Sequence, residues 1–273
     1  MLRLLALTTC ILAAAVAFAQ GPTPLTGPAT QESTALAPSQ FHHAEPPDPN
    51  MTASQLEGQA DTLRAQKYYA DAIDYYRAAL AKSPKAASLW NKLGIAELQL
   101  MRYVDAGKDF DRAVKLEPGL SDAVNNRGVV FYIQQDYKKA IKLYRKAIGL
   151  RPGSASFHSN LATALFSRQE FDKASAEYLR ALELDPDILE RQSSGGIQAH
   201  IASPQDRARY SYVVAKLYAR NGNFERSLHY LRKAIEEGYP HIESVYKDEE
   251  FAALRKDPRF EELMNSRPQA IPQ

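Results

Sequence analysis

Histidine and cysteine side chains offer the most versatile chemistry in this chain, which has six histidines and one cysteine among 273 residues. His42 and His43 are adjacent but have no further ligand nearby, so we expect solvated side chains and not a metal site. His158 falls at a core-facing helical position. Because Cys10 is the only cysteine in the sequence, neither a disulfide framework nor a multi-cysteine metal site is expected. The remaining histidines that could bear on catalysis have no partner at a regular spacing: His200, His229 and His241.

Catalytic sequence motifs are missing from the chain. It has no glycine-rich phosphate loop, no paired-histidine metalloprotease signature and no nucleophile elbow. We therefore expect no enzyme activity, no cofactor and no metal. Charge gives no sign of a nucleic-acid partner either, because 34 basic and 32 acidic residues leave a formal charge of only +2.

The N-terminus has the three parts of a secretory signal peptide. Met-Leu-Arg is followed by an apolar run from Leu4 to Phe18, and Ala17-Phe18-Ala19 supplies a small-x-small cleavage site. We predict a signal peptide over 1–19, cleavage after Ala19, and an exported protein that is periplasmic or secreted. The apolar run is short for a permanent span of the ~30 Å hydrocarbon core, so no integral membrane span is expected after cleavage. An uncleaved anchor is the alternative.

Residues 20–52 are rich in proline and polar residues and show no apolar periodicity. They are predicted to form a disordered linker. The last residues, 267–273, are predicted to be a flexible tail.

From Ala53 onward the sequence is periodic. Pro84, Pro118, Pro152 and Pro186 are each 34 residues apart, and two alanine and two aromatic columns keep the same interval. Each unit contains two amphipathic stretches, and the proline ends the second because it cannot continue the helical hydrogen-bond ladder. Such pairs must stack to bury their apolar faces. The expected units are 53–86, 87–120, 121–154 and 155–188.

A fifth unit is expected at 206–240, out of register. Phe224 and Ala234 follow Phe171 and Ala181 by 53 residues, which is one period plus a 19-residue insertion. The insertion, 187–205, contains Ser193-Ser194-Gly195-Gly196 and is predicted to protrude as a loop. Short capping helices are expected over 242–266, which would complete a helical solenoid over 53–266.

These columns, with Trp90 and Leu93-Gly94 in the second unit, resemble the tetratricopeptide repeat. The resemblance covers about 53–240 and implies an all-α, right-handed superhelical solenoid of antiparallel helix pairs. It also implies a concave wall, made by the first helix of each pair, that binds a protein or peptide partner. Transferred by frame, the middle and end of that wall would contain Asn91, Ile95, Leu98, Asn125, Val129, Tyr132, Ser159, Thr163, Phe166, Arg209, Tyr212, Lys216 and Arg220.

Two parts of this wall have alternative interpretations. Tyr132 and Phe166 could anchor a peptide or could pack between repeats. The basic far end, at Arg209, Lys216 and Arg220, could receive an acidic segment or could be a solvated helix face.

The carboxylate-binding site of chaperone-binding relatives is not expected. Acidic residues, among them Glu57, Asp61 and Asp122, and also Lys92, occupy the corresponding positions. Asn126 and Asn160 match consensus asparagines and are expected to be structural.

The sequence thus predicts a non-catalytic interaction module or adaptor in a bacterial cell envelope, acting in assembly or secretion. Two alternatives stay open: an accessory subunit of an envelope enzyme, and an intrinsic enzyme centred on 187–205. The pattern does not set the oligomeric state.

Overall fold

The computed structural model describes residues 45–190 and 204–266. The predicted signal peptide, most of the linker, residues 191–203 of the insertion and the tail lie outside the described residues. The described part contains helices and turns and no strand, which confirms the predicted all-α class. None of its helices combines the length and apolar character needed to cross a membrane.

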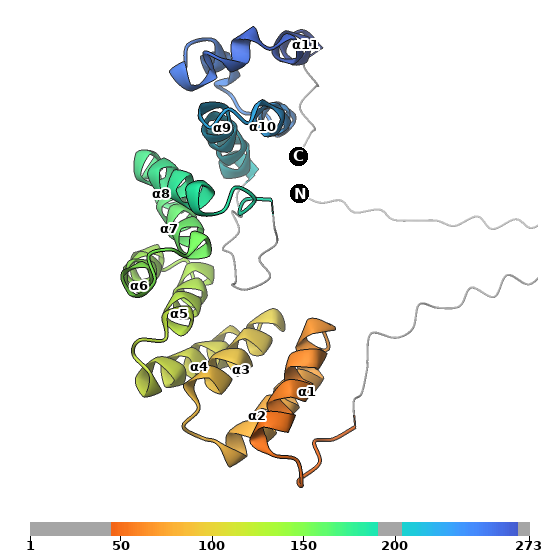
Figure 1. The fold of residues 1–273 in the computed structure, drawn as a ribbon. Helices are drawn as coiled ribbons and strands as arrows, with labels where there is room; N and C mark the ends of the chain where they lie inside the picture. The colour runs from red at the N-terminus through yellow and green to blue at the C-terminus, as the bar shows by residue number, and fades with distance from the viewer. Residues whose placement is uncertain (1–44, 191–203, 267–273) are drawn as a thin grey trace, which may run out of the picture. The chain divides into compact units, whose positions relative to one another are not determined.

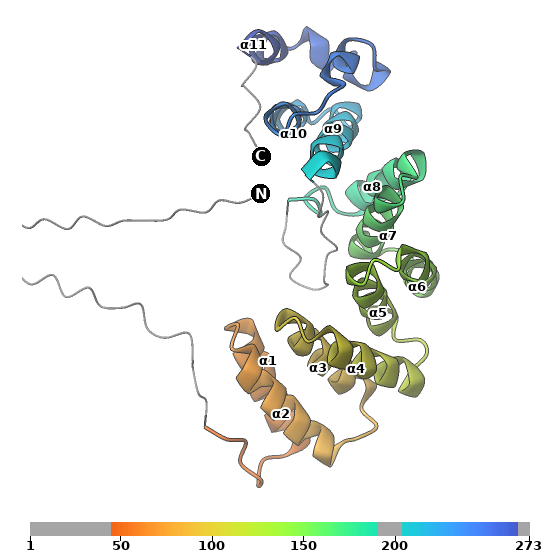
Figure 2. The ribbon, with the colours of Figure 1, turned by 180° about the vertical axis from the view of Figure 1, so that it is seen from behind.

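The helices follow one another as packed pairs, which Figures 1 and 2 show from opposite sides. The pairs are α1 (Ala53–Ala65) with α2 (Tyr69–Lys82), α3 (Ala87–Gln99) with α4 (Tyr103–Leu116), α5 (Ser121–Ile133) with α6 (Tyr137–Leu150), α7 (Ala155–Ser167) with α8 (Phe171–Leu184), and α9 (Pro204–Arg220) with α10 (Phe224–Glu236).

The turn inside each pair contains one residue with a left-handed backbone. The following N–H then bonds to the carbonyl five residues earlier, as Arg102 does to Glu97 at 2.9 Å, and this closes a Schellman motif. The left-handed residue is glycine only in the fifth turn, at Gly222. In the other four turns it is Lys67, Met101, Gln135 and Gln169, which are 34 residues apart.

Small residues on the first helices allow close packing by large aromatics on the second helices. A methyl group added at Gly94 would lie 2.7 Å from the ring of Phe110, and one added at Gly128 would lie 2.7 Å from the ring of Tyr144. Both rings are fully buried. The predicted large-beside-small pattern therefore operates within a pair, where a larger side chain would push the two helices apart.

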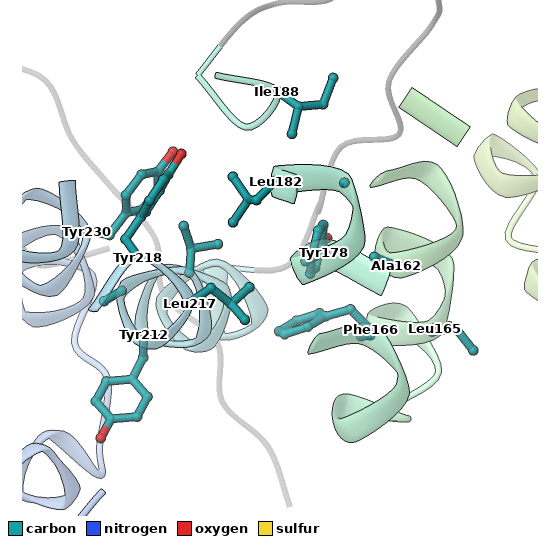
Figure 3. Close-up of a cluster of buried hydrophobic side chains, with 14 of the residues drawn as sticks. Ala162, Leu165, Phe166, Tyr178, Leu182, Ile188, Tyr212, Leu217, Tyr218 and Tyr230 are labelled. Carbon is teal, nitrogen blue, oxygen red and sulfur yellow. The ribbon is translucent and has the colours of Figure 1, made fainter. Parts of the chain in front are cut away.

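Between the fourth and fifth pairs, the start of the insertion folds back onto the core. Ile188 lies beside Leu182, while Leu217 of α9 points toward Phe166 of α7 (Figure 3). Arg226 of α10 donates to the carbonyl of Pro186 at 2.7 Å and also pairs with Asp187. These contacts fix the first residues of the insertion against α10.

The region after α10 differs in its first part from the short capping helices predicted over 242–266. It forms three 3₁₀ turns, η1 (Ile242–Tyr246), η2 (Glu249–Phe251) and η3 (Leu254–Lys256), and ends in α11 (Pro258–Ser266). Val245, Phe251 and Leu254 are fully buried, so each turn contributes one apolar side chain to the core. Short 3₁₀ turns suit this spacing because their side chains eclipse at every third residue.

Candidate functional site

The predicted wall residues on α3, α5 and α7 lie mostly inside the protein. Ile95 is half-buried, and the others are at most 9% exposed: Asn91, Leu98, Asn125, Val129, Tyr132, Ser159, Thr163 and Phe166. Their side chains are therefore available mainly for packing and hydrogen bonding inside the protein.

The asparagines form a ladder of side-chain hydrogen bonds across successive first helices. Asn126 of α5 donates to Asn91 of α3 at 3.0 Å, and Asn160 of α7 donates to Asn125 of α5 at 3.0 Å. Asn125 in turn donates to Asn126 at 3.2 Å, which joins the two rungs. Buried amides need such partners, so the ladder supports the expectation that Asn126 and Asn160 are structural.

The ladder begins with a charged rung. Lys92 of α3 donates to Glu57 of α1 at 2.7 Å and to Asp61 at 2.6 Å. Burial would raise the pKa of Asp61, but hydrogen bonds from Lys92 and Tyr76 outweigh it and hold that pKa below its usual value. The Lys92 ammonium is thus paired with two carboxylates of its own chain.

The two aromatic candidates lie in packing contacts. The ring of Tyr132 is 5.3 Å from that of Tyr137, and its hydroxyl is 3.0 Å from the Ser167 hydroxyl. Phe166 is 1% exposed and makes an edge contact with Phe171 at 5.1 Å. Packing accounts for both side chains here, and a role as peptide anchors stays a prediction.

His158 also has structural partners. Its Nδ1 is 2.6 Å from a carboxylate oxygen of Glu177, and its Nε2 is 3.1 Å from the carbonyl of Pro152. Across the described ranges no three potential metal-ligating side chains come together. The histidine is therefore held by one carboxylate and one carbonyl.

The four predicted residues of the fifth repeat do come together. Arg209, Tyr212, Lys216 and Arg220 of α9 line a cavity of about 580 Å³, which we call the cap groove. Its other walls are Phe171, Asp172, Ser175, Ala176 and Leu179 of α8, Val213 and Leu217 of α9, and Tyr239, Ser244, Asp248 and Glu250 from beyond α10.

Acidic residues from the turns after α10 compensate part of the positive charge in the cap groove. Lys216 lies 3.0 Å from Asp248 and 3.3 Å from Glu250. Burial would lower the pKa of Lys216, but these carboxylates outweigh it and raise that pKa. The hydroxyl of Tyr212 donates to Asp248 at 2.9 Å, and burial together with this carboxylate raises the pKa of Tyr212.

The two arginines of the groove are available for other partners. Arg209 stacks over the ring of Phe171 at 4.6 Å, and Arg220 is exposed. Neither forms an ion pair with another described residue. The far end of the predicted wall is therefore not simply basic, because Asp172, Asp248 and Glu250 match its three cations in number. It offers two separate guanidinium groups on either side of an apolar stretch.

Sequence reasoning did not find the α8 residues or Asp248 and Glu250. The four α9 residues follow from the repeat frame, but the acidic pair belongs to a segment outside the repeat. A weak signal was available in the run Lys247-Asp248-Glu249-Glu250, which follows a basic helix face by about 30 residues.

The comparisons with known proteins agree with the helix pairs. Tetratricopeptide repeat models match residues 58–121, 131–192 and 208–237. No curated protein matches the chain.

Similar solved structures include that of MamA, residues 41 to the end, from Desulfovibrio magneticus RS-1. Its sequence is 18% identical, the match covers 70% of this chain and 96% of that chain, and the TM-score is 0.49. YrrB, described as a TPR protein with an unusual peptide-binding site, has 20% identity, 71% and 91% coverage and a TM-score of 0.46. The first TPR of Spaghetti (RPAP3), bound to the HSP90 peptide SRMEEVD, has 22% identity, 46% and 99% coverage and a TM-score of 0.42. With its 34-residue period, its consecutive helix pairs and three matching repeat models, this chain belongs to the tetratricopeptide repeat family.

Proposed function

We propose that this protein is a non-catalytic interaction module that binds a segment of a partner protein in the cap groove. The observation that carries the proposal is the grouping of four first-helix residues, Arg209, Tyr212, Lys216 and Arg220, around one cavity. Members of this repeat family generally bind peptides or proteins on first-helix surfaces, as the resemblance implies.

The chemistry of the groove indicates which segment would fit. Leu179, Val213 and Leu217 supply an apolar surface for one or two apolar side chains of the partner. Arg209 and Arg220 are eleven positions apart on α9, which corresponds to about 16 Å along the helix. An extended peptide covers that length with about five residues. The preferred partner segment therefore has two acidic residues about five positions apart, with apolar residues between them.

The location of this activity is part of the proposal. We infer that the protein is exported and works as an adaptor in envelope assembly or secretion. The N-terminal apolar run supports export, and the absence of cysteine after Cys10 suits an oxidising compartment. N-terminal sequencing of exported protein should begin at Gln20; an intact Met1 would contradict cleavage.

Site-specific crosslinking tests the binding site. A photo-crosslinking residue placed at Ser175, on the groove wall, should capture one or a few proteins in intact cells. The same residue at the exposed Lys142 of α6, outside the groove, serves as the control and should not capture them. Equal capture from both positions, or none from Ser175, would refute binding in the groove.

Charge removal adds a second test. The double substitution Arg209→Gln and Arg220→Gln should weaken binding of the captured partner by about tenfold or more, because each charged hydrogen bond contributes about 1.5–3 kcal/mol. Arg232→Gln, at an exposed position on α10, should leave binding unchanged. Circular dichroism should show unchanged helicity in both variants.

A further inference from the structure

A second cavity, separate from the cap groove, lies among α2, α3 and α4. Its volume is about 410 Å³. One side is apolar and consists of Leu80, Ala81, Trp90 and Leu93. The other side is charged, and we call the whole cavity the α2–α4 pocket. Its charged residues are Arg77, Glu97, Asp105, Lys108 and Asp109.

The charged groups of the α2–α4 pocket are paired unevenly. Glu97, whose side chain is 1% exposed, accepts from Arg77 at 2.6 Å and from Arg102 at 3.2 Å. Lys108 pairs with Asp105 at 2.9 Å. One carboxylate thus takes two guanidinium groups.

Asp109 is the carboxylate left over. It lines the pocket and is half-buried, and it forms no hydrogen bond or ion pair with any residue the structure describes. Burial, and then the negative charge of Glu97, raise its pKa to about 7, although Arg77 and Lys108 act in the opposite direction. Its ionised form therefore needs a cation that the surrounding helices do not supply.

The apolar side of the pocket suits the rest of a basic side chain. Trp90 is fixed in place because its Nε1 donates to the carbonyl of Pro84 at 2.9 Å. Its ring can pack against an aliphatic stem and can attract a cation through its π face. Shortly before the pocket residue Asp105 in the sequence, Met101 and Val104 are 72% and 66% exposed, and they are the two most exposed large apolar residues in the described part of the chain.

We propose that the α2–α4 pocket is a second protein-binding site, which receives an arginine or lysine side chain of a partner. The stem of that side chain would lie on Trp90 and Leu93, and its charged head would pair with Asp109. Apolar residues flanking it in the partner would cover Met101 and Val104. The unpaired carboxylate of Asp109 favours a positively charged side chain of the partner, and the exposed apolar side chains favour apolar residues beside it.

Binding should depend on pH through Asp109. The charged groups that face it are Arg77 from α2, Glu97 from α3, and Asp105 and Lys108 from α4. With a pKa of about 7, Asp109 is about one-tenth ionised at pH 6 and about nine-tenths ionised at pH 8. If only the ionised form binds the cation, affinity should be about tenfold lower at pH 6 than at pH 8.

Trp90 is the only tryptophan in the chain, so its fluorescence reports directly on the pocket. The probe is a blocked five-residue peptide with a central arginine between two leucines, and the control peptide carries norleucine in place of the arginine. Titrated into the full-length protein at pH 8, the arginine peptide should give a saturable change in Trp90 fluorescence. The norleucine peptide should bind at least tenfold more weakly.

Two variants decide which carboxylate matters. Asp109→Asn should weaken the arginine peptide by about tenfold or more and should abolish the difference between pH 6 and pH 8. Asp111→Asn, on the same helix but paired with Arg127 at 2.8 Å, should bind like the unmodified protein. Asp109→Asn should fold, because the change removes a half-buried charge that has no ion-pair partner among the described residues.

Three results would overturn the proposal. They are no saturable fluorescence change, equal binding of the two peptides, and unchanged binding in Asp109→Asn. Equal binding would show a purely apolar pocket. Unchanged binding in Asp109→Asn would show that the arginine pairs elsewhere.

Discussion

Replacing Tyr144 by phenylalanine should make this protein more stable. Tyr144 is fully buried, and its hydroxyl has no hydrogen-bond partner among the described residues. The equivalent residues one repeat away on either side show two alternatives. Phe110 has no hydroxyl at all, and Tyr178 has one that lies 2.9 Å from the Thr163 hydroxyl.

The size of the effect follows from two opposing contributions. A buried polar group without a partner costs about 1–3 kcal/mol of stability, and this cost disappears in the variant. Loss of the oxygen leaves a void of roughly 20 Å³, which costs about 0.5 kcal/mol. The free energy of unfolding should therefore rise by about 1 kcal/mol.

Urea denaturation followed by circular dichroism measures this change. Tyr144→Phe should raise the midpoint without altering the denaturant slope. Tyr178→Phe is the matched control and should lower the free energy of unfolding by about 1 kcal/mol, because it removes a hydrogen bond that is made. If Tyr144→Phe destabilises the protein as much as the control does, the Tyr144 hydroxyl is satisfied in solution and the reasoning is refuted.

Three further predictions concern stability and are measured in the same way. Asn125→Ala should cost about 1–3 kcal/mol because it removes two buried hydrogen bonds of the ladder, and a loss below 0.5 kcal/mol would show that the ladder is not formed. Gly94→Ala should cost about 1–3 kcal/mol through overlap with the Phe110 ring, whereas Gly58→Ala, which meets nothing within 4 Å, should gain about 0.5–1 kcal/mol; equal effects would contradict the packing argument. Asp109 has a raised pKa in the folded state, so that state binds more protons than the unfolded chain between about pH 4 and 7, and stability falls as pH rises through that range. Asp109→Asn should remove this fall and gain more at pH 8 than at pH 4.5, and an equal gain at both values would contradict it.

The helix pairs could be predicted because the repeat samples the same local rules several times. Proline at the end of each unit and small residues on the first helices recur in every repeat. One ambiguous position therefore does not change the predicted helix boundaries. The burial of the wall residues could not be predicted in the same way. Asn91 and Asn125 are polar, and sequence alone does not distinguish an amide on the surface from one buried in a ladder.

The cap groove shows a second limit of sequence reasoning. Its α9 residues follow from the repeat, but Glu250 belongs to η2 and Asp248 directly precedes it, in a segment that has no counterpart in the other units. Their position depends on how Val245 and Phe251 pack, which is a tertiary effect without local periodicity. Asp109 was missed for a related reason, since Arg77 of α2 and Arg102, at the start of α4, both pair with Glu97 and not with Asp109.

The asparagine ladder also has a mechanical consequence. Its three rungs, which start from Lys92, Asn126 and Asn160, each join a first helix to the one before it across 35 residues. In the fifth repeat Val213 stands at the next position, and valine has no side-chain amide with which to extend the series. The first four repeats are thus joined by a continuous line of cross-links that stops before α9. Under a stretching force the joint between α8 and α9, which forms one side of the cap groove, should yield before the joints between the earlier repeats.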